Sequence, residues 1–138
     1  CHQLAMYVVF ESPLQMLCEN PSIYKQEPEC MRFLGPVPAV WDETRVLDAR
    51  IGDYIVVARR RYDTWYIGVM TNWTPRKFDI PLDFLPFGNW TAEIWKDGIN
   101  ADRYAEDFAM EKATVTAQDH FTAHLAPGGG WVAVLKQK

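Results

Sequence analysis

The pattern of hydrophobic and polar positions changes character after Pro38. Upstream of it, residues 2–10 are apolar on nearly every side, a pattern typical of a helix buried inside a larger structure. The rest of this part predicts a short buried strand at 14–17, a short helix capped by Asn20 or Ser22, and a helix at 28–34. The apolar surface of these few elements needs a partner elsewhere.

After Pro38 the pattern switches to the alternation of apolar and polar residues that is typical of strands. Clusters of Gly, Pro, Asn and Asp separate the expected strands. These strands are expected at 40–50, 54–61, 64–73, 76–80, 90–96, 107–116, 120–126 and 131–136. The hairpin at 53–73 is rich in Val, Ile, Tyr and Trp and is apolar on both faces, so we expect it in the middle of its sheet, covered on both sides.

Many short strands joined by local turns predict a mainly β fold, an antiparallel two-sheet β-sandwich. The stiff run Gly35-Pro36-Val37-Pro38 is the best domain boundary in the chain. We therefore expect a helical part at 1–36 and a sandwich at 37–138, and we expect the sandwich to hold a core of its own.

Composition and charge narrow the class of protein. The chain has 138 residues and is 49% hydrophobic, which predicts one folded domain, or one domain plus a fragment, rather than disorder. A net charge of −4 argues against nucleic acid or an anionic membrane surface as the main partner. The one basic cluster, 59–61, is interpreted as a solvated hairpin end. No apolar run is long enough to span a membrane.

Metal-binding side chains are sparse. His120 and His124 share one face of an expected strand, but four residues of strand span roughly 13 Å, too far for both to bind one zinc ion. They are interpreted as outward-facing residues opposite Phe121 and Leu125. The three cysteines have no metal-ligand spacing, so we expect no metal site in this chain.

Six tryptophans could stack on sugar rings. Alternation places Trp90 and Trp131 with core residues, whereas Trp95 falls on the opposite face of its strand with Thr91 and Glu93. Trp95 is therefore the best candidate for an exposed carbohydrate-stacking platform.

Several stretches together resemble one known family. They include HQLAMYVVFESPLQML at 2–17, VWDET at 40–44, IGDYIVVARR at 51–60, WYIGVMTNW at 65–73, KDGINAD at 96–102 and APGGGW at 126–131. In this order they resemble the end of the catalytic barrel and the C-terminal β-sandwich of glycoside hydrolase family 97, a family of α-glucosidases and α-galactosidases. The resemblance covers nearly the whole chain.

The resemblance implies that residues 2–10 are the seventh helix of a (β/α)₈ barrel, 14–17 its eighth strand and 28–34 part of its eighth helix. The sandwich would thus follow a short helical remnant of the barrel. Active sites of such barrels lie at the C-terminal ends of the strands, so Glu19 and Asn20 become candidates for the rim of the substrate site. The acid and base carboxylates of the family lie upstream, so no catalytic residue is expected here.

For the parent enzyme the resemblance implies a bound Ca²⁺ ion, an α-linked oligosaccharide substrate, and a periplasmic or secreted location in a Gram-negative bacterium. Its partners would be the barrel and the N-terminal domain of the same polypeptide. The chain opens at Cys1 within an apolar segment and is interpreted as a piece of that longer protein. No cofactor is expected in this piece. Its own acidic groups are not expected to be catalytic: Asp42 with Glu43 is expected to precede a strand, and Asp102 with Glu106 and Asp107 is interpreted as a solvated cluster in a polar loop.

The sequence supports two candidate functions, one as part of an enzyme and one as a binding module. The first is the non-catalytic C-terminal part of an α-glycoside hydrolase, which braces the barrel. The alternative is a free-standing carbohydrate-binding β-sandwich module. The apolar helix at 2–10 favours the first, because a helix without a polar side has no use in an independent lectin.

Overall fold

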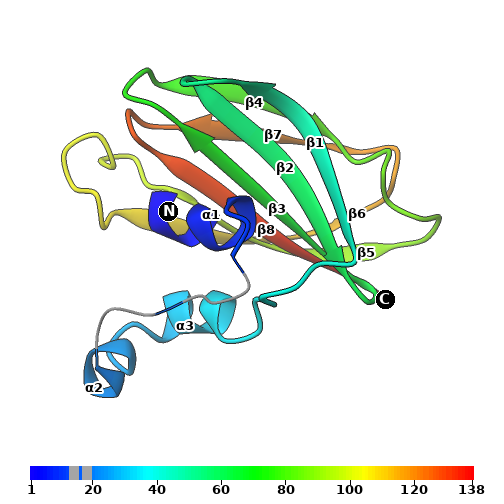
Figure 1. Ribbon diagram of the computed structural model, residues 1–138, viewed down its shortest axis with the longest axis horizontal. Helices are drawn as coiled ribbons and strands as arrows, with labels where there is room; N and C mark the ends of the chain where they lie inside the picture. Colours follow the sequence, from blue (N-terminus) through cyan, green and yellow to red (C-terminus); the bar gives the residue numbers. More distant parts are fainter. Residues whose placement is uncertain (13–15, 17–19) are drawn as a thin grey trace.

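The computed structural model describes residues 1–12, 16 and 20–138. Its strands form two antiparallel sheets, one six-stranded with the order β1-β2-β3-β8-β5-β6 and one two-stranded with β4 beside β7 (Figure 1). The strand bounds are Glu43–Arg50 (β1), Tyr54–Arg61 (β2), Thr64–Thr71 (β3), Arg76–Pro81 (β4), Trp90–Asp97 (β5), Phe108–Val115 (β6), His120–Leu125 (β7) and Gly130–Gln137 (β8).

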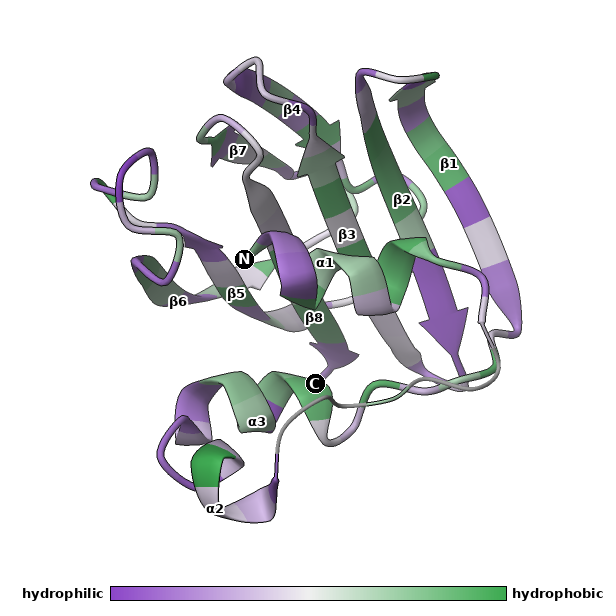
Figure 2. Ribbon diagram, turned by 60° about the vertical axis from the view of Figure 1, so that its left-hand side comes forward, coloured by the Kyte–Doolittle hydropathy of each residue, from purple (hydrophilic) through white to green (hydrophobic). Residues whose placement is uncertain are grey.

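Three helices precede the strands: α1 (His2–Val9), α2 (Pro21–Tyr24) and α3 (Pro28–Leu34). Helices α1 and α3 lie against one face of the six-stranded sheet, which we name the outer face, and β4 and β7 cover the inner face (Figure 1). The six-stranded sheet is therefore the middle layer of three. Figure 2 shows green segments on β3, in the middle of this sheet, and purple segments along β1 at its edge.

The side chains of β3 alternate between two hydrophobic cores, one on each face of the six-stranded sheet. Trp65, Ile67 and Val69 point to the inner face and pack with residues of β4 and β7. Tyr66 points to the outer face, where Leu4, Ala5, Val8 and Phe33 of the helices cover it together with its neighbours on β2, β5 and β8. Both faces of the central strand are thus buried, as the apolar pattern of the hairpin predicts.

The sequence-based elements agree with the observed ones. The β-sandwich is confirmed, each strand expected after Pro38 is present, and the hairpin of β2 and β3 lies inside the sheet. The largest difference is β1, which begins at Glu43 because the residues at 40–42 form a bend that leads into it. The expected strand at 14–17 falls mainly on residues outside the described part of the chain.

Candidate functional site

The outer face is the part of the sandwich with the most specific contacts to another segment. Two glycines let α1 lie directly on β3 and β8. A Cβ atom at Gly68 would lie 2.9 Å from Cβ of Val8, and one at Gly130 would lie 2.6 Å from Cα of His2. Glycine in a strand permits such an approach of a neighbouring backbone. These two glycines thus form a seat for the helix, that is, a part of the sheet where no side chain separates it from α1.

Helix α3 covers Trp95. The indole is 1% exposed, its ring centroid lies 5.2 Å from that of Phe33, and its Nε1 donates a 3.1 Å hydrogen bond to the carbonyl of Glu29. The prediction of Trp95 as an exposed stacking platform is therefore wrong. The alternation along β5 was correct, but the opposite face of the strand is covered by a helix that is distant in sequence.

Two polar contacts fix the end of this helical segment. The hydroxyl of Tyr66 donates a 3.1 Å hydrogen bond to the carbonyl of Pro36, and burial raises the pKa of Tyr66. The guanidinium of Arg32 donates two hydrogen bonds to the carboxylate of Glu93, which also pairs with Lys112 at 2.8 Å. The hydrogen bond from Arg32 is the main cause that lowers the pKa of Glu93. The segment is thereby held by charge as well as by packing.

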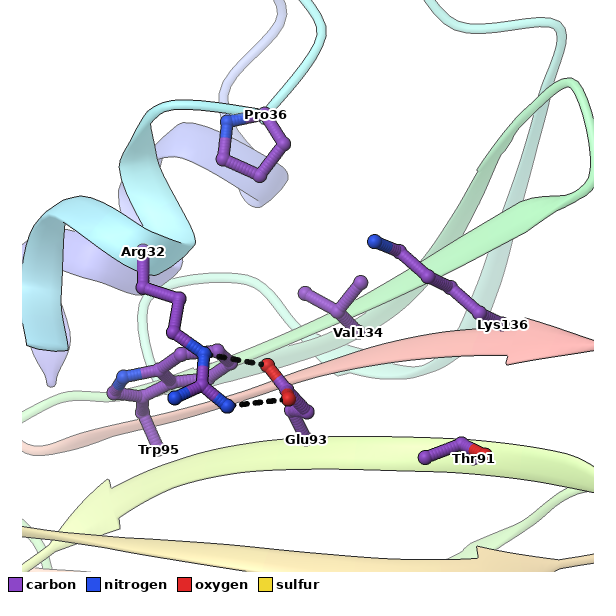
Figure 3. Close-up of a pocket in the computed structure, with 7 residues that line it drawn as sticks. All are labelled: Arg32, Pro36, Thr91, Glu93, Trp95, Val134 and Lys136. Atoms are coloured by element: carbon purple, nitrogen blue, oxygen red, sulfur yellow. Dashed lines mark hydrogen bonds and ion pairs between the residues drawn. The ribbon is translucent and has the colours of Figure 1, made fainter.

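A shallow groove of about 250 Å³ lies beside this ion pair, between α3 and the strands β5 and β8 (Figure 3). Glu93 is the only carboxylate among the seven residues that line it, and that carboxylate is already paired. Glycoside hydrolysis by the common mechanisms needs two carboxyl groups, roughly 5 to 9.5 Å apart. The groove does not offer that pair.

Arg59 joins the sheet to the C-terminal end of α1. Its Nη2 donates a 3.2 Å hydrogen bond to the carbonyl of Val9 and pairs with the carboxylate of Glu11 at 2.8 Å, and the guanidinium lies 5.6 Å from the ring of Trp41. Arg59 is 4% exposed, so its interpretation as part of a solvated hairpin end is wrong. A last-turn carbonyl is a natural acceptor for an arginine, because it has no partner within its own helix.

Three of the acidic residues weighed as candidates, Asp42, Glu43 and Asp107, have structural partners. The backbone N–H of Tyr62 is the main cause that lowers the pKa of Asp42, and Arg45 and Arg60 lower the pKa of Glu43. Both groups are therefore held ionised and are poor general acids. Asp107 accepts a 2.8 Å hydrogen bond from the backbone N–H of residue 100 and so stabilises its own loop.

Of the two candidates for the substrate rim, the structure describes only Asn20. Its Oδ1 accepts hydrogen bonds from the backbone N–H groups of Ser22 and Ile23, so it caps α2 as expected, and the residue is exposed. Glu19 lies outside the described residues. Their role at a substrate site stays a prediction.

His120 and His124 are exposed on β7, opposite its buried residues, as the alternation predicted. Within residues 1–12, 16 and 20–138, no group of three His, Cys, Asp or Glu side chains could hold a metal ion. No helix in the same part of the chain is long and apolar enough to cross a membrane.

Comparison with known proteins matches this geometry to one family. Residues 40–136 match the sequence model described as glycosyl-hydrolase 97 C-terminal, oligomerisation. The chain belongs to this family. The family 97 resemblance seen in the sequence is thereby confirmed, and the described fold is that of the C-terminal sandwich rather than of a catalytic barrel.

Relatives of this family 97 C-terminal domain match it over nearly its whole length. A retaining α-galactosidase of Bacteroides thetaiotaomicron is 46% identical over 136 residues, which are 99% of this chain and 20% of that protein. A family 97 enzyme from Pseudoalteromonas sp. strain K8, solved in complex with acarbose, is 39% identical with a TM-score of 0.94, covering 99% of this chain and 22% of that one. A β-arabinopyranosidase structure is 30% identical with a TM-score of 0.80, covering 96% and 20%. The chain spans about a fifth of the length of these relatives.

Proposed function

We propose that this family 97 domain is the C-terminal part of an α-glycoside hydrolase, in which it supplies no catalytic carboxyl group, braces the catalytic barrel and joins copies of the enzyme. The outer face carries the proposal. Gly68, Gly130 and Arg59 form a specific seat for α1, and the family description names oligomerisation. An independent sugar-binding module has no need of an apolar helix held on its sheet.

In this proposal α1 is the seventh helix of the barrel and α3 belongs to the eighth. The sandwich then holds these last helices of the barrel, α1 through Arg59 and α3 through Glu93. Asn20, which precedes α2, is proposed for the substrate rim. Asn20 is exposed, which supports that assignment, and its Nδ2 could donate a hydrogen bond to a sugar hydroxyl. Glu19 is proposed for the same rim.

The substrate class of the parent enzyme is proposed as α-galactosides or α-glucosides. One relative is described as a retaining α-galactosidase, and another family 97 enzyme was solved with acarbose. We extend the proposal to a Ca²⁺ ion bound by the barrel domain and to a periplasmic or secreted location. Both rest on the family resemblance.

A turnover assay tests the non-catalytic role. The 138-residue chain is expected to hydrolyse neither 4-nitrophenyl α-galactoside nor 4-nitrophenyl α-glucoside, because Asp42 and Glu93 are paired with arginines and Asp107 accepts a hydrogen bond from its own loop. Turnover that is abolished by Glu93→Gln or Asp42→Asn would overturn the proposal.

Calorimetric titration with α-linked oligosaccharides tests the alternative, a free-standing carbohydrate-binding module. The proposal predicts no heat of binding, since Trp95 is buried under α3. Saturable binding by the chain would favour the module instead.

A further inference from the structure

Four loops meet at the end of the sandwich where β2 and β8 begin, and hydrogen bonds join each loop to the next. The N–H of Asn72 donates to the carbonyl of Asp53, and the N–H of Gly128 donates to the carbonyl of Asn72, both at 2.8 Å. The carboxylate of Asp97 accepts from the N–H groups of Ala126 and Gly130. Hydrogen bonds therefore link the bases of the loops at 50–53, 71–76, 126–130 and 97–108 at this end of the sandwich.

The tips of these loops carry large apolar side chains that point to solvent. We name them the loop-end patch: Ile51, Trp73, Ile99, Tyr104 and Pro127. Ile51 is fully exposed, and Ile99 and Trp73 are 95% and 85% exposed. Single exposed apolar residues are ordinary, but several on adjoining loops mark an interaction site.

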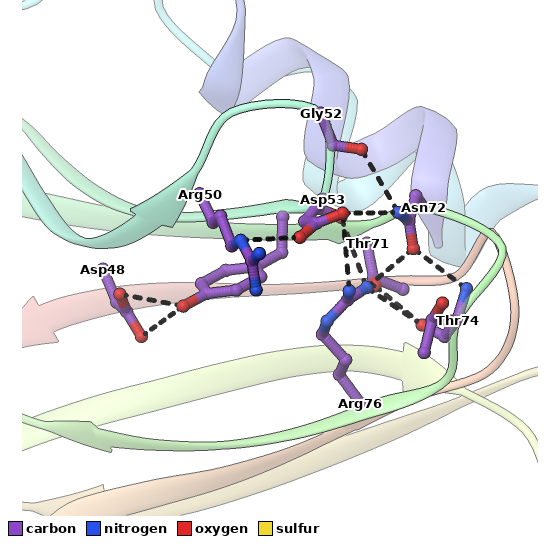
Figure 4. A network of polar contacts seen from close by, with 9 residues as sticks. Asp48, Arg50, Gly52, Asp53, Thr71, Asn72, Thr74 and Arg76 are labelled. Atoms are coloured by element: carbon purple, nitrogen blue, oxygen red, sulfur yellow. Dashed lines mark hydrogen bonds and ion pairs between the residues drawn. The ribbon is translucent and has the colours of Figure 1, made fainter.

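A polar network fixes two of these tips before any partner arrives (Figure 4). Nη1 of Arg76 donates to the side-chain carbonyl of Asn72 at 2.7 Å, and Nδ2 of Asn72 donates to the carbonyl of Gly52 at 3.2 Å. The indole of Trp73 lies against Gly128, where a Cβ atom would be 3.2 Å from its Cζ3. An aromatic side chain on an ordered loop loses little conformational entropy when it binds, which is typical of an interface anchor.

We propose that the loop-end patch is the surface by which two copies of this chain associate. The proposal rests on the oligomerisation role proposed above and adds the surface. In a twofold dimer the same patch of both copies is in contact. Positive side chains of one copy must therefore be able to meet negative side chains of the other. The patch meets this condition, because Arg50 pairs with Asp53 and Arg103 pairs with Asp102 at its rim, and each sign can meet the other.

Sedimentation equilibrium of the 138-residue chain under reducing conditions tests the proposal. The wild-type chain is expected to self-associate, and Trp73→Ser combined with Ile51→Ser should weaken the association at least about 30-fold, as loss of an anchor residue does. Ile99→Ser, on a separate loop, should weaken it as well and covers the case in which the double variant is poorly folded. The matched control is Phe87→Ser, which removes a fully exposed aromatic from the opposite end of the sandwich and should leave the association unchanged.

The outcomes separate this proposal from the one on which it rests. If the wild-type chain associates but the loop-end variants associate equally well, the loop-end surface is wrong and the oligomerisation role stands. If the wild-type chain remains a monomer at all concentrations, both the surface and the oligomerisation role are wrong. Thermal melts of each variant must match the wild type, because these side chains are exposed.

Discussion

The two faces of the six-stranded sheet are both apolar, but different parts of the chain close them. The inner face is closed by β4 and β7, which belong to the same run of strands. The outer face is closed by α1 and α3, which precede the sandwich, and it adds polar contacts through Arg59 and Glu93. We therefore infer that the inner face is the core of the sandwich itself, and that the outer face is a joint between the sandwich and the helical part that precedes it.

The largest effect should come from the inner face. Trp131 is 1% exposed, and its ring centroid lies 5.5 Å from that of Phe121. Trp131→Ala should lower the free energy of unfolding by about 3–5 kcal/mol, because it leaves a cavity among packed side chains. Urea unfolding followed by circular dichroism measures this. Phe87→Ala is the control, and an equal loss in both variants would contradict the assignment of the inner core.

Removal of the helical part tests whether the outer face is a joint. A chain that starts at Pro36 should stay folded around its inner core and lose on the order of 2 kcal/mol of stability, because the lost burial of large side chains is partly offset by the ordering entropy of the segment. Its uncovered outer face should bind a hydrophobic dye more strongly than the full chain does. A shortened chain that is unfolded would show that 1–36 and 37–138 share one core and that the boundary at Gly35-Pro36 is wrong.

The smallest effect should come from the ion pair at α3. Because the pKa of Glu93 is lowered in the folded state, its contribution is fully present above its ordinary pKa of 4.5 and is lost as the pH falls through the lower folded value. Glu93→Gln should therefore lower the melting temperature slightly at pH 7 and leave it unchanged in strong acid. Glu111→Gln, on the exposed edge strand β6, is the control. If both variants change the melting temperature equally across this pH range, Glu93 does not contribute to the joint.

Alternation predicted strands such as β4 and β7, whose burial changes at every residue, and short continuous apolar runs predicted β3 and β8, which are buried on both faces. Neither pattern could tell what covers each face. Trp95 stands on the face of β5 with Thr91 and Glu93, two residues that suggest solvent, but α3 returns from more than sixty residues upstream to bury the indole.

Arg59 was mispredicted for a related reason. A run of three arginines at a hairpin end normally faces solvent. The partners of Arg59 are backbone carbonyls of α1, about fifty residues away, and a backbone acceptor leaves no mark in the sequence. Gly68 and Gly130 are glycines within strands, and such a glycine can mark a close backbone approach.

The most direct test of the joint is Gly68→Ala, measured by urea unfolding in both the full chain and the chain that starts at Pro36. The three nearest atoms to the added Cβ all belong to α1, on Val8 and Val9. In the full chain the substitution should therefore cost about 1–3 kcal/mol through overpacking. In the shortened chain it should stabilise by about 0.5–1 kcal/mol, because alanine loses less conformational entropy than glycine in a strand. A change of sign between the two chains is the predicted result, and the same effect in both would contradict the account that α1 is seated on this sheet.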